Sequence, residues 1–203
     1  MSDRRLEAAQ FYEEARSRRA EGNWTGAFAR YRRVLEITDE LNDPRWKAEV
    51  LAELGRMYQE ACDLTEARRW YGAALEQFAA LDIPAESGAL LYRLAQVEHL
   101  AGDLDAAERL YEEAMRGCAA AGDLAGEGLA LAGLGSVFWD RRQEPEGLRL
   151  AVRGLQRVRQ AGSPEADALL ERIRSWRAST GPVRYRGIVQ QVVEDPELRR
   201  ELM

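Results

Sequence analysis

Residues 54–74, LGRMYQEACDLTEARRWYGAA, lie across two apolar stripes of helical spacing that are separated by a short break. The first stripe is spaced i, i+3, i+4 and i+7, as on one helix face, and consists of Leu51, Leu54, Gly55 and Tyr58. The second consists of Ala67, Tyr71, Ala74 and Phe78. Because the break Cys62-Asp63-Leu64 lies between them, the segment predicts two helices joined by a tight turn.

Breaks of this kind recur with a period of 40 residues. One set lies at Gly22-Asn23-Trp24, Cys62-Asp63-Leu64, Gly102-Asp103-Leu104 and Arg142-Gln143-Glu144. A second set, half a period away, lies at Asn42-Asp43-Pro44, Asp82-Ile83-Pro84, Gly122-Asp123-Leu124 and Gly162-Ser163-Pro164. Gly and Asn favour helix C-caps, Asp and Ser favour N-caps, and Pro fits the first helical turn. The pattern therefore predicts paired helices of about 17 residues, each roughly 25 Å long.

This pattern resembles the signature of the tetratricopeptide repeat, which is matched by Leu54, Gly55, Tyr58, Ala67, Tyr71 and Ala74. The repeat length is similar to that of the long subtype in kinesin light chains, in Pins-type adaptors and in the sensor arms of bacterial regulators. The resemblance implies an all-α fold, a right-handed superhelix (solenoid) of about four helix pairs with C-terminal capping helices. It implies protein binding rather than catalysis, although one such fold hosts many functions.

The predicted repeat domain covers residues 1–179. Its helix pairs lie at residues 8–43, 44–83, 84–123 and 124–163, followed by a capping helix at 165–179. After the break Thr180-Gly181-Pro182, residues 180–203 form a C-terminal segment whose apolar stripe is Ile188, Val189, Val192 and Val193. One interpretation is a cap over the apolar end of the solenoid. The other is docking on a second protomer, which gives a homodimer, or on another protein.

Small residues at fixed positions indicate close packing. Gly55 and Gly135 lie mid-helix, where glycine costs about 1 kcal/mol relative to alanine, so we expect a neighbouring helix to approach them. The fourth repeat departs from the signature, with Gly147, Ala151 and Gly154 where Ala, Tyr and Ala are expected. We expect the C-terminal segment to sit on that shallow surface.

In the family that the chain resembles, peptides bind to the concave face, which is lined by the first helix of each pair. The corresponding positions are Tyr12, Arg16, Arg19, Ala52, Arg56, Gln59, Tyr92, Arg93, Gln96, His99, Ala132, Ser136 and Trp139. Guanidinium groups and aromatic rings suit an acidic or C-terminal peptide. The alternative is a solvated helix face in an arginine-rich protein. Paired Lys and Asn residues of a chaperone-type carboxylate clamp are not present at these positions.

Composition excludes several other classes of function. The net charge of −6 argues against nucleic-acid binding. No apolar run approaches the roughly 20 residues of a membrane helix, and the N-terminus lacks the apolar stretch of a secretory signal, so a cytoplasmic location is expected. Cys62 and Cys118 fall at different phases of the repeat, which predicts free thiols.

No feature of the sequence predicts catalysis. His99 is the only histidine, so a His-rich metal site is impossible. Phosphate-binding loops, metal-ligand spacings and nucleophile motifs are absent, so neither a cofactor nor an enzymatic activity is expected. Three functions compete: an adaptor that binds a peptide or protein in the concave groove, a sensor arm of a bacterial signalling or transcription system, and a protein that self-assembles through its C-terminal segment.

Overall fold

The computed structural model describes residues 2–81 and 83–203, so Asp82 of one predicted break lies outside the described residues. Within these ranges the chain is all-helical, which confirms the predicted fold class. The helices are α1 (Ser2–Ala20), α2 (Trp24–Glu40), α3 (Pro44–Glu60), α4 (Leu64–Ala80), α5 (Pro84–Ala101), α6 (Leu104–Ala120), α7 (Leu124–Asp140), α8 (Glu144–Gln160), α9 (Glu165–Thr180), α10 (Pro182–Val192) and α11 (Pro196–Leu202).

Seven of the turns between α1 and α9 are each built around one residue with a left-handed backbone. Such residues lie at Gly22, Asn42, Cys62, Gly102, Gly122, Arg142 and Gly162. At five of these turns the residue that follows ends one helix and caps the next: Asn23, Asp43, Asp63, Asp103 and Asp123. Asp63, for example, donates its amide to the carbonyl of Tyr58 at 2.9 Å, as in a Schellman motif, and its side chain accepts from the Glu66 amide at 3.1 Å. Because such a residue closes one helix and caps the next, the turns stay short and successive helices from α2 to α8 begin 20 residues apart.

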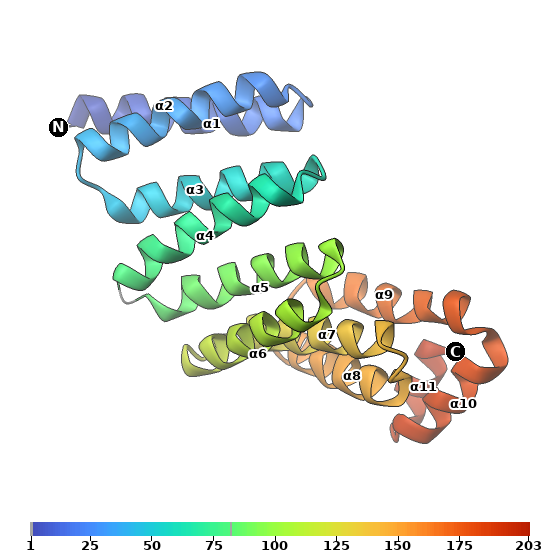
Figure 1. The fold of residues 1–203 in the computed structure, drawn as a ribbon. Coiled ribbons are helices and arrows are strands. Elements are labelled where there is room, and N and C mark those ends of the chain that lie inside the picture. Colours follow the sequence, from blue (N-terminus) through green and yellow to red (C-terminus); the bar gives the residue numbers. More distant parts are fainter. Residues whose placement is uncertain (1, 82) are drawn as a thin grey trace.

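The helix pairs α1/α2, α3/α4, α5/α6 and α7/α8 lie in successive layers from the N-terminus toward the C-terminal helices (Figure 1). The signature residues form the core of each layer: Ala67 and Ala74 are fully buried and Tyr71 is 1% exposed. Gly55 shows why a small residue is needed there. A Cβ atom at Gly55 would lie 2.6 Å from Cδ1 of Tyr71, so the glycine makes room for an aromatic ring of the partner helix.

Helices α7 and α8 cross in direct backbone contact. A Cβ atom at Gly135 would lie 2.6 Å from the carbonyl oxygen of Gly147, and one at Gly154 would lie 2.4 Å from that of Gly128. The prediction that Gly147, Ala151 and Gly154 seat the C-terminal segment is therefore wrong. Because these residues lack bulk, their surface is occupied by α7 itself.

The C-terminal helices α9, α10 and α11 instead pack on other residues of α8. They share one apolar cluster with α8, which includes Leu148, Val152, Leu155, Leu170, Ile173, Tyr185, Val189, Leu198 and Leu202. Of the predicted docking stripe, Ile188, Val189 and Val193 are at most 6% exposed, and Val192 packs against the same cluster. These side chains face their own chain, so docking elsewhere would require α10 to leave this position.

Candidate functional site

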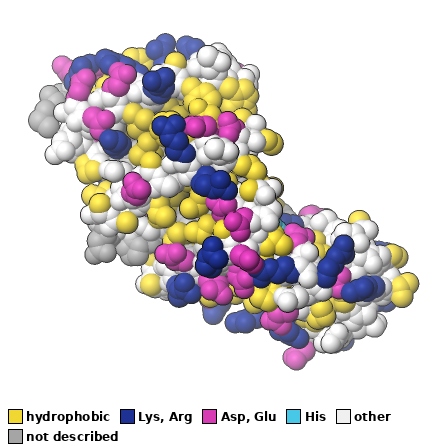
Figure 2. Space-filling view, viewed as in Figure 1, with side chains coloured by type: hydrophobic (Ala, Val, Ile, Leu, Met, Phe, Trp, Pro, Cys, Tyr) yellow, Lys and Arg dark blue, Asp and Glu magenta, His cyan; other side chains and the backbone are white. Residues whose placement is uncertain are grey.

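A hollow of about 390 Å³ lies between α1, α3 and α5, a volume within the range of small ligand sites. We call it the groove. Its lining residues are Tyr12, Glu49, Ala52, Glu53, Arg56, Tyr71, Phe78, Glu86, Ala89, Leu90 and Arg93. The face in Figure 2 shows charged side chains of both signs interspersed with apolar surface. The first helices of three pairs thus form a hollow, and α4 contributes Tyr71 and Phe78 to it.

Two neighbouring helices contribute residues of the same spacing to the groove. The row on α3 is Glu49, Ala52, Glu53 and Arg56, and the row on α5 is Glu86, Ala89, Leu90 and Arg93. Each row is spaced i, i+3, i+4 and i+7, which keeps its members on one helix face. Each begins with a glutamate, continues with an alanine and ends with an arginine. The small alanines leave the middle of the groove open.

The two rows lie at matching heights. Arg45 reaches both glutamates, with Nε 3.5 Å from Oε1 of Glu49 and Nη2 2.9 Å from Oε1 of Glu86. At the other end, burial raises the pKa of Tyr71 to about 12, and the nearby positive charges of Arg93 and Arg56 oppose that rise. One end of the groove therefore carries both glutamates, and the other end carries both arginines.

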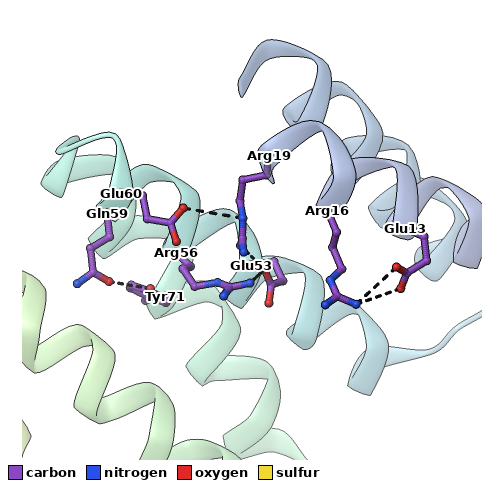
Figure 3. A network of polar contacts seen from close by, with 8 residues as sticks. All are labelled: Glu13, Arg16, Arg19, Glu53, Arg56, Gln59, Glu60 and Tyr71. Carbon is purple, nitrogen blue, oxygen red and sulfur yellow. Dashed lines mark hydrogen bonds and ion pairs between the residues drawn. The ribbon is translucent and has the colours of Figure 1, made fainter. Parts of the chain in front are cut away.

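Most arginines on this face are already paired (Figure 3). Arg19 lies 3.0 Å from Glu53 and 3.8 Å from Glu60, and Arg56 pairs with the same Glu53. Arg16 lies 3.3 Å from Glu13. Gln59, another predicted binding residue, accepts a hydrogen bond from the hydroxyl of Tyr71 at 2.9 Å. The surface is consequently a network of both charges rather than a cationic face.

Arg93 differs from these arginines. It makes no ion pair within residues 2–81 and 83–203, and its guanidinium lies 5.9 Å from the centre of the Tyr92 ring. Its charge contributes slightly to the lowered pKa of Glu165, which is lowered chiefly by a hydrogen bond from Ser163. Arg93 is therefore the cation of the groove that is most available to a ligand.

An aromatic pair lies at the α1 side of the groove. The rings of Tyr12 and Tyr31 meet edge to face, with centroids 5.5 Å apart. Burial raises the pKa of both phenols, with a further contribution from the Glu53 carboxylate. The hydroxyl of Tyr31 is buried and has no hydrogen-bond partner among the described residues. Tyr12 is the member of the pair that lines the groove.

Three predicted residues of the third repeat, Tyr92, Gln96 and His99, contact other residues of the protein instead of lining the groove. Gln96 donates to the hydroxyl of Tyr92 at 3.0 Å. His99 lies 2.7 Å from Asp140 of α7, and its ring meets Tyr111 edge to face at 6.4 Å. None of these three predicted residues lines the groove, so their proposed role in binding has no support from its geometry.

The fourth repeat does not extend the groove. Ser136 is 9% exposed and donates to the carbonyl of Ala132 at 3.1 Å. Trp139 is 5% exposed, because Trp176 of α9 stacks on it at 4.4 Å and Tyr185 of α10 meets its edge at 6.2 Å. The expectation that Ser136 and Trp139 face a ligand is therefore wrong, since the protein's own C-terminal helices cover this position.

Sequence reasoning missed several groove residues, chiefly Glu49, Glu53, Glu86, Ala89 and Leu90. The available signal was the glutamate and arginine seven residues apart on two successive first helices. This signal is weak, because glutamates and arginines on a helix surface usually face solvent. The floor residues Tyr71 and Phe78 have the spacing of core residues in the sequence.

Comparisons with known proteins support the repeat. The tetratricopeptide repeat family model matches residues 7–80, which confirms the resemblance for this region; the long subtype stays a prediction. A search of curated proteins finds no significant match.

Several solved structures share the fold. BtubC (BKLC) from P. vanneervenii has a TM-score of 0.73 at 17% identity, over 97% of this chain and 88% of that one. A Rap protein complexed with competence and sporulation factor has a TM-score of 0.76 at 12% sequence identity, and the alignment covers 97% of this chain and 55% of the Rap chain. A kinesin light chain protein of nearly identical TPR-like repeats from Podosopora anserina has a TM-score of 0.68 at 17% sequence identity. The alignment covers 95% of this chain and 94% of that one. At these identities the likeness shows the fold alone.

Two further observations concern classes of site. No helix in the described part of the chain has the length and apolar character to cross a membrane. Among the described residues, no three or more His, Cys, Asp or Glu side chains are grouped so that they could hold a metal ion. Cys62 is exposed, Cys118 is buried, and both are free thiols.

Proposed function

We propose that this chain is a non-catalytic adaptor of cytoplasmic location that binds a segment of another protein in the groove between α1, α3 and α5. The observation that carries the proposal is the hollow itself. Alanines on two successive helices open an apolar floor, and fixed charges surround it. An apolar centre with a small number of placed polar groups is typical of binding sites. The repeat fold adds support, because extended repeat surfaces commonly serve binding.

The proposal is tested by filling the groove. Ala89 is exposed on α5 and lines the hollow, so Ala89→Trp should block it without disturbing the core. Ala119 is exposed on α6 and does not line the groove, so Ala119→Trp is a matched control. In affinity purification from the native host, we expect the first variant alone to lose partners. Equal recovery by both variants would contradict a groove-based function.

An acidic or C-terminal peptide is the simplest ligand for an arginine-lined face. Here Arg19 and Arg56 already pair with Glu53, so such a ligand would depend mainly on Arg93. We therefore propose binding of a peptide or protein segment in general. An acidic ligand is a more specific version of this proposal.

A sensor arm is a second candidate. It is favoured by the similarity to the Rap protein that is complexed with competence and sporulation factor. In this version, ligand binding in the groove changes the arrangement of the helix pairs. Small-angle X-ray scattering with and without a groove ligand tests it: a change in radius of gyration supports a sensor, whereas an unchanged profile favours a static adaptor.

Self-assembly through the C-terminal segment is a weaker candidate, because its apolar stripe is buried in its own chain. A homodimer of this kind would require α10 to be exchanged between protomers. Light scattering on the full chain over a range of concentrations decides this point, since a constant monomer mass contradicts self-association.

A further inference from the structure

The groove has opposite net charges at its two ends. At the first end, Glu49 and Glu86 share the single guanidinium of Arg45, which leaves one negative charge in excess. At the second end, Arg19 and Arg56 are balanced by Glu53 and Glu60, as Figure 3 shows. Arg93 adds one positive charge there, because it makes no ion pair among the described residues.

The distance between the two ends follows from helix geometry. Glu49 and Arg56 are seven residues apart on α3, as are Glu86 and Arg93 on α5. Seven residues of α-helix span about 10 Å. Between the charged ends lie Ala52 and Glu53 on α3 and Ala89 and Leu90 on α5. Arg19 and Arg56 neutralise the charge of Glu53, so the uncharged surface between the ends is apolar. The groove therefore has an acidic end, an apolar centre and a basic end, in that order along α3 and α5.

We propose that the preferred occupant of the groove is an extended peptide segment that carries a basic and an acidic residue on either side of small apolar residues. Its basic residue lies at Glu49 and Glu86, and its acidic residue lies at Arg93 and Arg56. This inference rests on the proposed function and specifies the chemistry of the partner. It replaces the acidic ligand that the arginines alone suggest.

The distance between the two ends sets the spacing of the charges in an extended ligand. Its basic and acidic side chains must reach ends that are about 10 Å apart. In an extended chain, side chains three or four residues apart are separated by about 10 to 13 Å and can lie on one side. The charged residues of the ligand should therefore be separated by three or four positions.

Selection from a library of random seven-residue peptides tests both levels of the proposal. The peptides are displayed on phage and selected on the wild-type chain, and clones that still bind Ala89→Trp are removed. We expect the remaining clones to be enriched in a basic and an acidic residue three or four positions apart with apolar residues between. Groove-dependent clones of another composition, including purely acidic ones, would overturn the inference and leave the proposed function intact. Absence of groove-dependent clones would overturn both.

A charge reversal then tests the orientation. Arg93 is exposed and outside any ion pair in the described ranges, so Arg93→Glu should preserve the fold, as circular dichroism can verify. It should weaken binding of a selected peptide about tenfold, because one attraction is lost and one repulsion is added. The same variant should gain affinity for that peptide with its acidic residue changed to lysine. Arg109→Glu, an equivalent change at an exposed site of α6, is the control, and equal effects of the two variants would contradict the assignment.

Discussion

At the residue scale, replacing glycine by alanine can have opposite effects on stability at two positions of the helix pair α3/α4. Gly55 lies against the ring of Tyr71, so that an added Cβ would lie 2.6 Å from a ring carbon. Gly72, on α4, has no atom within 4 Å of an added Cβ. Helix propensity favours alanine at both sites by about 1 kcal/mol. Packing therefore determines whether an added methyl group stabilises or destabilises the protein at Gly55, whereas helix propensity determines it at Gly72.

We expect Gly55→Ala to destabilise the protein and Gly72→Ala to stabilise it. Overpacking at Gly55 costs about 1–3 kcal/mol, which exceeds the gain in propensity, and a leucine at this site should cost still more. Gly72→Ala should gain up to about 1 kcal/mol. Urea denaturation of the two variants measures the difference. Equal changes in the free energy of unfolding would contradict the close contact with Tyr71.

Cys118 gives a prediction for alkaline pH. Its thiol is buried, and that burial, together with the charge of Asp123, raises its pKa to about 11. In the unfolded chain the thiol has its ordinary pKa of about 8.5. The unfolded state therefore loses a proton first, and the free energy of unfolding falls as the pH rises from about 9 to 11. Below pH 8 this contribution to stability is fully present.

Cys118→Ala should weaken that alkaline dependence. Denaturation at pH 8 and at pH 10.5 should show a smaller loss of stability in Cys118→Ala than in the wild type. Cys62→Ala, which alters the exposed thiol, should retain the wild-type loss. The result that contradicts the account is an equal loss in all three proteins, which would assign the pH dependence to other groups such as the buried tyrosines.

At the element scale, the C-terminal helices complete the fourth helix pair. Trp176 of α9 stacks on Trp139 of α7, and the hydroxyl of Tyr185 donates to the carbonyl of Ile173 at 3.2 Å. Arg184 of α10 pairs with Glu144, whose side chain is almost fully buried at the start of α8. The Trp139–Trp176 and Glu144–Arg184 contacts join residues about 40 positions apart in the sequence. They explain why the groove ends before α7.

We expect Trp176→Ala to loosen this cap selectively. Truncation of a buried tryptophan costs about 3–5 kcal/mol, and each layer of a repeat array contacts mainly its neighbours. Hydrogen exchange should therefore accelerate in α9, α10 and α11 while α1 to α4 keep their protection. Uniform acceleration along the whole chain would show instead that the array unfolds as one unit.

At the scale of the whole molecule, the repeat could be predicted from the sequence because its determinants are local. A left-handed residue such as Cys62 and the cap that follows it define each turn within a few residues. The end of the groove could not be predicted in this way. Trp139 has the spacing of a concave-face residue, and only the position of Trp176, far along the chain, shows that it is covered.

The charge pattern of the groove depends only partly on local sequence. The i,i+3 spacing of Glu53 and Arg56 permits their ion pair, whereas the contact of Arg19 with the same carboxylate depends on how α1 packs on α3. That Glu49 and Glu86 lie together depends on how α3 and α5 pack, which Arg45 reveals by contacting both. Periodicity gives the face of a helix, whereas the register between helices comes from packing.

The most direct test of the account is a methyl NMR titration of the full chain with a peptide selected on it. We predict that the methyl signals of Ala52, Ala89 and Leu90 shift on binding, because these residues line the groove. Those of Ala132 and Val152, buried near the C-terminal helices, should stay in place. Shifts confined to the second set, with the first set unchanged, would contradict the claim that the groove between α1, α3 and α5 is the binding site.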